Sequence, residues 1–405
     1  MEKSLQAFPV IVLSGARQTG KSTFLQCEFG NMHYITVDDY DILSQAKKDP
    51  HSLWEGKREV VIDEVQKAPE IISAIKITVD RERRKRKFII SGSSNLLLME
   101  KVTESLAGRA AYFEMLPLLY GEILEHDREK VRFFEIWKKN FAVEETEVDN
   151  AESLQFASEW MLRGFMPPLI FIQESSNILL WWDSYIRTYL ERDLRELSQV
   201  HSLVDFRNLM VALALRSGNI LNQTEIARDI QLNQPTVFRY MKLLEVSSII
   251  KRIPPIFPSR TKRIIKSPKI YFIDPGLAIY LSGYYELESL NKSKELCSFF
   301  ETMVFLHLYA LGQLCQPKAN LHYLRTTTGS EVDFVLESGR KIIPFECKFT
   351  QKPGYGDIKN LLRFIDANPE VHLGFLLHTG KKIGYLHRKV IAAPWWWLFS
   401  SSDTK

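Results

Sequence analysis

The chain is poor in cysteine, and this scarcity limits what can hold it together. Four cysteines occur among its 405 residues, and no two of them have the Cys-x-x-Cys spacing of zinc and redox motifs. A disulfide framework requires a much higher density of cysteine. We therefore expect reduced thiols and a cytoplasmic location. The four residues are Cys27, Cys297, Cys315 and Cys347.

Long apolar runs and a large excess of charge are also missing. Apolar stretches such as residues 209–215 and 394–399 fall well short of the ~20 residues that a membrane-spanning helix needs, so no membrane partner is expected. The net charge of +4 neither requires nor excludes a nucleic-acid partner. A content of 45% hydrophobic and 25% charged residues is ordinary for folded proteins. This length predicts about two to four domains.

A glycine-rich motif directly follows the first predicted strand. Residues 8–13 are apolar, and the next residues fit the pattern G-x-x-x-x-G-K-[ST] of a phosphate-binding loop that opens a helix. Backbone amides of such a loop bind phosphate oxygens, Lys21 reaches the β- and γ-phosphates, and Ser22 ligates Mg²⁺. The expected nucleotide-binding residues are Gly15, Ala16, Arg17, Gln18, Thr19, Gly20, Lys21, Ser22 and Thr23.

Acidic residues end two further predicted strands. The strand over residues 59–62 is followed by Asp63 and Glu64, which predicts that Asp63 holds Mg²⁺ and that Glu64 orients or deprotonates the attacking water. This pair favours hydrolysis of ATP over the chemistry of a small-molecule kinase. The strand over residues 33–37 ends in Asp38 and Asp39, which we interpret as caps of the following helix.

Polar and basic residues lie on both sides of the fourth predicted strand. That strand, residues 88–90, leads to Ser93 and Asn95, either of which would contact the γ-phosphate unless these residues only form a turn. Arg109 precedes a strand and would reach phosphate in its own subunit or in a neighbour's, and the second case implies a homo-oligomer. The basic run over residues 81–87 is either a solvated helix end or a nucleic-acid contact.

Together these residues resemble the AAA-type P-loop ATPases of bacteria and archaea in which a domain of unknown function follows the ATPase. The resemblance implies ATP hydrolysis, and relatives usually carry further residues ahead of the first strand. It continues in a helix ending in Thr-x-Leu-Glu-Arg-Asp193, which is typical of the following domain. The motifs that carry it are Gly-Ala-Arg-Gln-Thr-Gly-Lys-Ser22, Ile-Asp-Glu-Val-Gln66, Ser-Gly-Ser-Ser-Asn95, Leu-Ala-Gly-Arg109 and Leu116-Pro117-Leu118 with Glu122.

Residues 222–230 and 235–244 predict a helix-turn-helix, with a strand over residues 247–253 as its wing. The second helix presents Thr236, Arg239 and Lys242 on its outer side. This pattern resembles the winged helix of bacterial regulators, whose second helix enters the major groove of DNA. A winged helix used for protein contacts is the alternative interpretation.

Two carboxylates and a lysine converge near the C-terminus. A turn at residues 338–339 would place Asp333 opposite Pro344, on the same face as Glu346 and Lys348. The segment resembles PD-(D/E)XK nucleases. That resemblance implies that Asp333 and Glu346 bind Mg²⁺, that Glu301 assists from the helix over residues 295–311, and that Lys348 positions water or stabilises phosphate charge. Alternation of acids and lysines on an exposed strand is the alternative, and cleavage activity is a separate hypothesis.

The whole sequence therefore predicts an α/β protein that begins with a parallel-sheet P-loop NTPase domain. A helical connector, a winged helix and an α/β restriction-endonuclease-like domain are expected to follow. We expect it to bind and hydrolyse ATP with Mg²⁺ and to act on DNA through its C-terminal half. The alternative is a nucleotide-dependent binding or regulatory protein with an inactive nuclease fold. The expected boundaries are residues 1–125, 126–205, 206–260 and 265–400.

Overall fold

A computed structural model describes the chain over residues 1–82, 84–92, 105–125, 131–138, 146–147, 154–188, 202–256, 267–326 and 329–401. Contacts divide the chain into two compact units. The first consists mainly of Met1–Leu116 together with Tyr240–Ile249, and the second contains Pro117–Ile186, Ser202–Arg239 and Ile250–Lys405. Within the described ranges, no helix is both long and apolar enough to cross a membrane.

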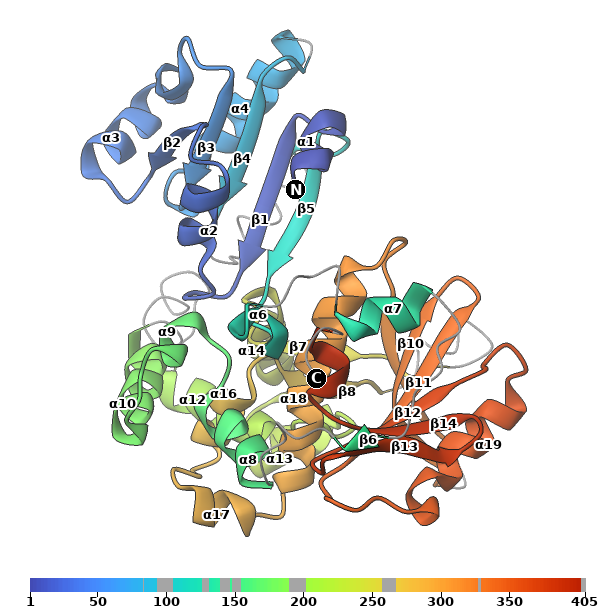
Figure 1. Ribbon diagram of the computed structural model, residues 1–405. Helices are drawn as coiled ribbons and strands as arrows, with labels where there is room; N and C mark the ends of the chain where they lie inside the picture. Colours follow the sequence, from blue (N-terminus) through green and yellow to red (C-terminus); the bar gives the residue numbers. More distant parts are fainter. Residues whose placement is uncertain are drawn as a thin grey trace. The chain divides into compact units, whose positions relative to one another are not determined.

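The first unit is built on a parallel sheet with the strand order β2-β3-β4-β1-β5 (Figure 1). Every neighbouring pair in it is parallel, and each strand lies within two residues of the range expected from the sequence. Because β4 lies between β1 and β3, its carboxyl end lies between the P-loop and Asp63. The strands are β1 (Val10–Gly15), β2 (His33–Thr36), β3 (Glu59–Asp63), β4 (Lys87–Ser91) and β5 (Ala110–Met115).

Helices cover both faces of this sheet. Val10 and Val12 of β1 belong to a core cluster with Trp54 and Ile71, whereas Ile11 and Leu13 belong to a second cluster with residues of the first two helices. This alternation follows from the two-residue period of a strand, and burial on both faces is typical of parallel α/β sheets. The helices are α1 (Glu2–Ala7), α2 (Lys21–Glu28), α3 (Tyr40–Lys48), α4 (Glu70–Arg81) and the 3-10 helices Pro50–Trp54 and Val65–Lys67.

The second unit contains a mixed sheet with the strand order β6-β13-β14-β12-β11-β10-β9. Strands β11, β12 and β14 run parallel, and the other neighbouring pairs are antiparallel. Helix α18 (Leu296–Leu314) contacts β9, β10 and β11, while α19 (Lys359–Ala367) contacts β10 and β11. The strands are β6 (Thr146–Glu147), β9 (Asn320–Arg325), β10 (Glu331–Ser338), β11 (Lys341–Lys348), β12 (Gly374–His378), β13 (Lys382–His387) and β14 (Val390–Pro394).

The stretch expected as a separate helical connector contributes to this C-terminal sheet. Strand β6, green in Figure 1, pairs with β13, red, and so extends the sheet at that end. Helix α7 (Arg132–Lys138) contacts the 3-10 helix Trp397–Phe399, and Arg132 donates a 2.7 Å hydrogen bond to Ser400. The expected assignment of residues 126–205 and 265–400 to separate domains is therefore wrong, because strand pairing joins these two segments. The remaining helices before residue 200 are α6 (Tyr120–Ile123), α8 (Leu154–Arg163), α9 (Pro167–Ile170) and α10 (Ser175–Tyr185).

The two helices of the expected helix-turn-helix are present. Asn222 caps the first, accepting a 3.2 Å hydrogen bond from the amide of Glu225, and the inner residues Ile226 and Val237 are fully buried. Strand β7 pairs in antiparallel fashion with β8, so β8 belongs with β7 and not, as expected, with the nuclease-like segment. The elements are α12 (Leu203–Ala214), α13 (Gln223–Asp229), α14 (Gln234–Val246), β7 (Ile250–Ile253) and β8 (Lys269–Phe272), followed by α16 (Pro275–Leu281) and α17 (Leu287–Asn291).

A buried carboxylate joins α8 to the start of α16. Asp274 accepts 2.8 Å hydrogen bonds from the amides of Phe165 and Gly276, and its burial raises its pKa to about 7. The backbone at Gly164 passes so close that a Cβ there would lie 2.5 Å from Asp274 Oδ1 and 2.8 Å from the ring of Trp182. This contact therefore requires glycine at position 164.

We expect Gly164→Ala to destabilise the protein more than Gly283→Ala. The φ angles are similar, +87° and +84°, so the left-handed conformation costs each alanine about 1–2 kcal/mol. Nothing lies within 4 Å of a Cβ at Gly283, whereas Gly164→Ala also overpacks its site, at a further cost of about 1–3 kcal/mol. Urea unfolding measures both changes, and equal shifts of the midpoint would contradict this packing.

Candidate functional site

The P-loop begins where β1 meets the backbone of β5. Gly15 has a φ of +149°, and a Cβ on it would lie 2.3 Å from the carbonyl oxygen of Met115. Gln18 and Gly20 also have positive φ angles, and α2 begins directly afterwards at Lys21. Only glycine allows the approach of β5 at position 15, and the loop delivers its amides to the N-terminal end of a helix, where anions bind.

Lys21 is buried against the loop that precedes it. Its ammonium donates hydrogen bonds of 3.1 Å to the carbonyl oxygen of Gly15 and 2.7 Å to that of Ala16. Burial lowers the pKa of Lys21 to about 8, although the nearby carboxylates of Glu64 and Asp63 oppose this shift. The positive charge is thus held between the P-loop and the acids that follow β3.

Asp63 is the last residue of β3, and three donors fix its carboxylate. Tyr34 donates a 2.7 Å hydrogen bond to Oδ2, the amide of Glu64 donates one of 3.0 Å to Oδ1, and the hydroxyl of Ser91 also donates to Oδ1. Burial and the bond to Asp63 raise the pKa of Tyr34. Carboxylate and hydroxyl oxygens are the ligands that Mg²⁺ prefers, so Asp63 and Ser22 fit this ion together with nucleotide phosphates.

Glu64 has a left-handed backbone, with a φ of +58°. Such a conformation is uncommon in a residue other than glycine, and Gln18 of the P-loop shares it. The side-chain amide of Gln66 donates to Glu64 Oε2, and burial raises the pKa of the Glu64 carboxyl. A raised pKa makes a carboxylate a better general base near neutral pH.

The sequence analysis assigned no role to Tyr34, Gln66 or Ser91. Tyr34 and Gln66 hold the two acids in place, but only the strand order and the turn after β3 reveal this. Ser91 lies at the end of β4, where the sequence predicted a phosphate-contacting residue at Ser93 or Asn95. Both of these lie outside the described residues.

Arg109 lies at the opposite end of the strands from the P-loop. It immediately precedes β5, whose far end, Met115, pairs with Gly15, and a strand of this length spans about 20 Å. Its guanidinium bonds Asp80 at 2.7 and 2.8 Å. A contact between Arg109 and phosphate in its own chain is therefore wrong, whereas a role in a neighbouring subunit stays a prediction.

The contacts of two other acidic and basic segments support their structural interpretations. Asp39 caps α3 by accepting hydrogen bonds from two backbone amides, at 2.8 and 3.1 Å. Within the basic run, Arg86 pairs with Glu82 at 3.0 Å and donates a 2.8 Å hydrogen bond to the carbonyl oxygen of Trp54. These contacts favour a helix end over a nucleic-acid contact at Arg86.

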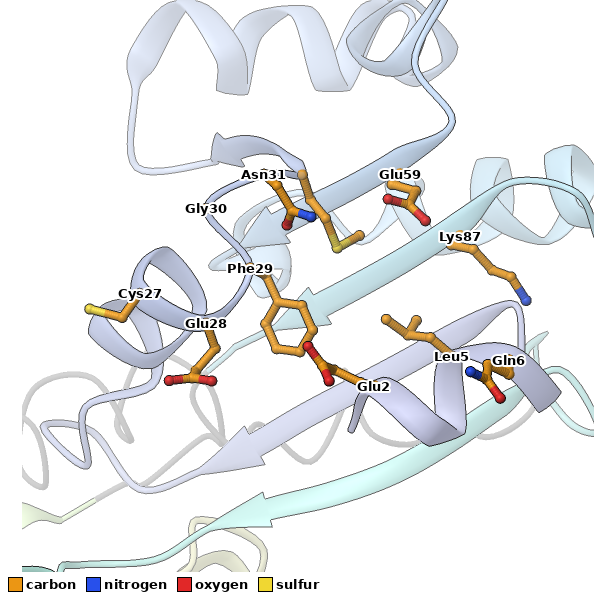
Figure 2. A pocket seen from close by; sticks show the side chains of 11 residues that line it. Glu2, Leu5, Gln6, Cys27, Glu28, Phe29, Gly30, Asn31, Glu59 and Lys87 are labelled. Carbon is orange, nitrogen blue, oxygen red and sulfur yellow. The ribbon is translucent and has the colours of Figure 1, made fainter.

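A cavity of about 570 Å³ lies near the amino ends of β3 and β4 (Figure 2). Glu59 and Lys87, the first residues of these strands, line it. The P-loop follows the carboxyl end of β1, and the walls of this cavity include no P-loop residue among those described, so the nucleotide site is elsewhere. The other lining residues are Glu2, Leu5, Gln6, Cys27, Glu28, Phe29, Gly30, Asn31 and Met32.

The β10–β11 hairpin turns one residue later than the sequence predicted. Ser338 pairs with Lys341, and Val335 takes the place opposite Pro344 that was expected for Asp333. Gly339, with a φ of +65°, therefore occupies the turn itself. The expected register is wrong by two residues, and an even shift leaves side chains on the same face.

Asp333, Glu346 and Lys348 therefore still lie together. Asp333 Oδ2 accepts a 2.8 Å hydrogen bond from the amide of Cys347, and Lys348 donates one of 2.7 Å to Glu346 Oε1. Asp333 is 9% exposed and Glu346 is 4% exposed. Burial and the nearby charge of Asp333 raise the pKa of Glu346 to about 8.

A lysine from β8 enters the same group of side chains. Lys269, which is 2% exposed, places its ammonium 2.9 Å from Glu301 Oε1, 2.7 Å from Glu331 Oε1 and 4.0 Å from Asp333 Oδ1. Tyr271 of the same strand also donates to Glu301 Oε1, and burial raises the pKa of Glu301 to about 7. The sequence analysis missed Lys269, although a lysine within an apolar strand was a signal that it has a buried partner.

These contacts do not fit the metal site expected from Glu301, Asp333 and Glu346. Glu301 accepts hydrogen bonds from Lys269 and Tyr271, which occupy one of its oxygens. With Lys269 in place, no three His, Cys, Asp or Glu side chains of the described ranges form a group that could hold a metal ion. The expected role of Glu301 as a ligand is therefore not supported, because a protein cation occupies that place.

The residues expected to contact DNA lie along α14. Thr236 is half-buried, and its amide donates a 2.8 Å hydrogen bond to Asn233 Oδ1, while Arg239 and Lys242 are exposed. Gln234 donates a 2.9 Å hydrogen bond to Thr224 of α13, which ties the start of α14 to the preceding helix. The two basic side chains are thus accessible on a helix whose start is well defined.

Three family descriptions match successive regions of the chain. Residues 7–124 match an AAA domain. Residues 155–288 match the domain of unknown function DUF8612, and residues 297–398 match the domain of unknown function DUF4143. The parallel sheet and P-loop at the N-terminus are therefore those of an AAA-type domain. The winged-helix and nuclease-like interpretations stay predictions.

Relatives at low identity extend over most of the chain. Uncharacterized proteins of Mycobacterium tuberculosis and Mycobacterium bovis are each 28% identical over 396 residues, which covers 97% of this chain and 82% of each relative. An uncharacterized protein of Methanocaldococcus jannaschii is 24% identical over 342 residues, covering 80% of this chain and 71% of its own length. The similarity is thus not confined to the P-loop region.

Two solved structures resemble the chain weakly. The Walker-type ATPase of Pyrococcus abyssi is 18% identical with a TM-score of 0.44, covering 69% of this chain and 93% of that protein. A signal transduction ATPase with numerous domains from Pyrococcus horikoshii, which has a tetratricopeptide repeat sensor, is 12% identical with a TM-score of 0.23. That match covers 76% of this chain and 45% of the other.

Proposed function

We propose that the AAA-type domain binds ATP with Mg²⁺ and hydrolyses it. The observation that carries this proposal is the convergence of Lys21, Asp63 and Glu64, whose charges influence one another at the carboxyl ends of β1 and β3. A P-loop lysine beside an acid suited to Mg²⁺ and a second acid with a raised pKa provides the groups that phosphoryl transfer to water requires.

Each of these residues has a separate task. Lys21 and the N-terminal end of α2 bind the phosphates, and Mg²⁺, when bound, neutralises charge on their oxygens. Ser22 and Asp63 hold that ion, and Tyr34 with Ser91 keeps the Asp63 carboxylate in one orientation. Glu64 accepts the proton of the attacking water, and Gln66 positions its carboxylate. Arg109 of a neighbouring copy is our prediction for a further phosphate contact, and it implies a homo-oligomer.

The C-terminal half acts, in this proposal, as a DNA-binding or regulatory module that does not cut DNA. Support for binding comes from Arg239 and Lys242, two exposed cations that lie three residues apart on α14. Residues with this spacing are neighbours on the surface of a helix, so both charges can face the same phosphate backbone. Support for the absence of cleavage comes from Lys269, whose ammonium lies 2.9 Å from Glu301 and 4.0 Å from Asp333, two of the acids expected to hold a metal ion.

We expect Glu64→Gln to keep ATP binding and to lose hydrolysis. Removing a general base slows turnover by roughly 10²–10⁴-fold, whereas the amide leaves the shape of the site unchanged. The control is Glu59→Gln, an exposed acid at the amino end of the same strand, which should leave turnover unchanged. Phosphate release and nucleotide binding are measured side by side, and full turnover by Glu64→Gln would exclude this carboxylate as the base.

We expect the affinity for ATP to fall as the pH rises above about 8, the pKa of Lys21. The affinity falls with rising pH because only the protonated ammonium attracts phosphate, so binding must take up a proton above that pKa. Each further pH unit weakens binding roughly tenfold. Calorimetry in two buffers of different ionisation enthalpy measures the proton uptake. Lys3→Ala, at an exposed lysine, should retain the profile, and an affinity that stays flat across this range would refute the assignment.

We expect Lys242→Ala to weaken DNA binding and to reduce its salt dependence by about one ion. The control Lys292→Ala removes the same charge from an exposed lysine of the same chain and should have no effect. Fluorescence anisotropy of labelled duplex DNA at several salt concentrations measures both variants.

The same mixtures with Mg²⁺ should leave the DNA uncut. Cleavage by the wild type that Asp333→Ala abolishes would show a nuclease instead.

A further inference from the structure

Lys269 and the acids around it come from different regions of the chain. The lysine belongs to β8, which pairs with β7 and lies within residues 155–288, the range that matches DUF8612. Glu301, Glu331 and Asp333 belong to α18 and β10, within residues 297–398, the range that matches DUF4143. The side chain of Lys269 therefore reaches from residues 155–288 into a group of carboxylates that belongs to residues 297–398.

The geometry is that of one cation surrounded by carboxylates. The ammonium of Lys269 lies within 3 Å of oxygens of Glu301 and Glu331 and 4.0 Å from Asp333. The side chain of Lys269 is 3% exposed and that of Glu301 is 13% exposed, so the ammonium is removed from water, whereas Glu331 keeps part of its side chain in contact with it. Acids brought together in this way repel one another unless a cation lies among them, and a buried cation is costly unless acids surround it.

We propose that Lys269 is the built-in cation of this carboxylate group and takes the place that a divalent metal ion would otherwise occupy. An ammonium is a compact point charge with three donors, which suits several carboxylate oxygens at once. Because the lysine is part of the chain, it is always present at the group, and it links β8 to α18 and β10. In this proposal, the acids of residues 297–398 attach strand β8, which belongs to residues 155–288.

Removal of the lysine should expose a site for a metal ion. Without it, oxygens of Glu301, Glu331 and Asp333 lose their cation, and Glu346 Oε2 is already buried without a hydrogen-bond partner among the described residues. A set of carboxylate oxygens is what Mg²⁺, Mn²⁺ and Ca²⁺ prefer. The proposal therefore predicts that Lys269→Met binds a divalent ion more tightly than the wild-type protein does.

The test uses Mn²⁺ and the full chain in the absence of nucleotide. Paramagnetic resonance measures free Mn²⁺ during titrations of the wild type, Asp333→Asn, Lys269→Met, Lys269→Met combined with Asp333→Asn, and the exposed control Lys292→Met. We expect Lys269→Met to gain one Mn²⁺ site, with affinity at least about tenfold above any binding by the wild type. The added Asp333→Asn should remove this site, and Lys292→Met should behave as the wild type.

Two results would overturn the proposal. The first is a Mn²⁺ site in the wild type that Asp333→Asn abolishes, because the lysine would then not replace the ion. The second is a folded Lys269→Met that binds no more Mn²⁺ than the wild type. If Lys269→Met is unfolded by circular dichroism, Mn²⁺ should restore its structure, and failure to do so also counts against the proposal. ATP turnover and DNA binding are measured separately, so failure of the proposed function would not be confused with these outcomes.

Discussion

A buried charge needs a partner of opposite sign, and this constraint shapes the chemistry of both units. In the first unit, Lys21 is buried near Asp63 and Glu64, and its ammonium bonds the loop that precedes it. In the second, Lys269 is buried among Glu301, Glu331 and Asp333. The two lysines differ in whether their partners neutralise the positive charge of the ammonium. Backbone carbonyls hold Lys21, whereas carboxylates compensate the charge of Lys269.

This difference separates a site suited to ligand from a structural contact. Carbonyl oxygens carry only partial charge, so phosphate can compete for Lys21. The hydroxyls of Tyr34 and Ser91 orient the Asp63 carboxylate without neutralising its charge. The carboxylate therefore keeps the negative charge that suits Mg²⁺. At Lys269 the neutralisation is internal, and Tyr271 adds a further donor to Glu301. A buried lysine near acids is therefore available to a ligand in one unit and fully paired with carboxylates in the other.

Much of the fold could be predicted because local patterns determine it. The P-loop and the strands of the first sheet follow from short apolar runs that end in glycine or acid, and the family match over residues 7–124 confirms the AAA-type domain. The helix-turn-helix elements followed from the spacing of residues such as Ile226 and Val237, which are buried as expected. The β10–β11 register was wrong by two residues, because either Ser338-Gly339 or Gly339-Arg340 can form the turn and the pattern alone does not distinguish them.

The sequence by itself determined the candidate site residues: the P-loop with Lys21, the acids Asp63 and Glu64, and the group around Asp333 and Glu346. Only the tertiary structure decided which partners each of them has. Strand order placed Tyr34 and Ser91 at Asp63, and the pairing of β5 with β1 placed Arg109 at the end of the strands opposite the P-loop. The packing of β8 against α18 brought Lys269 to the carboxylates. The physical reason is that periodicity and motifs report contacts along one segment, whereas the partner of a buried charge comes from a distant segment that only packing brings near.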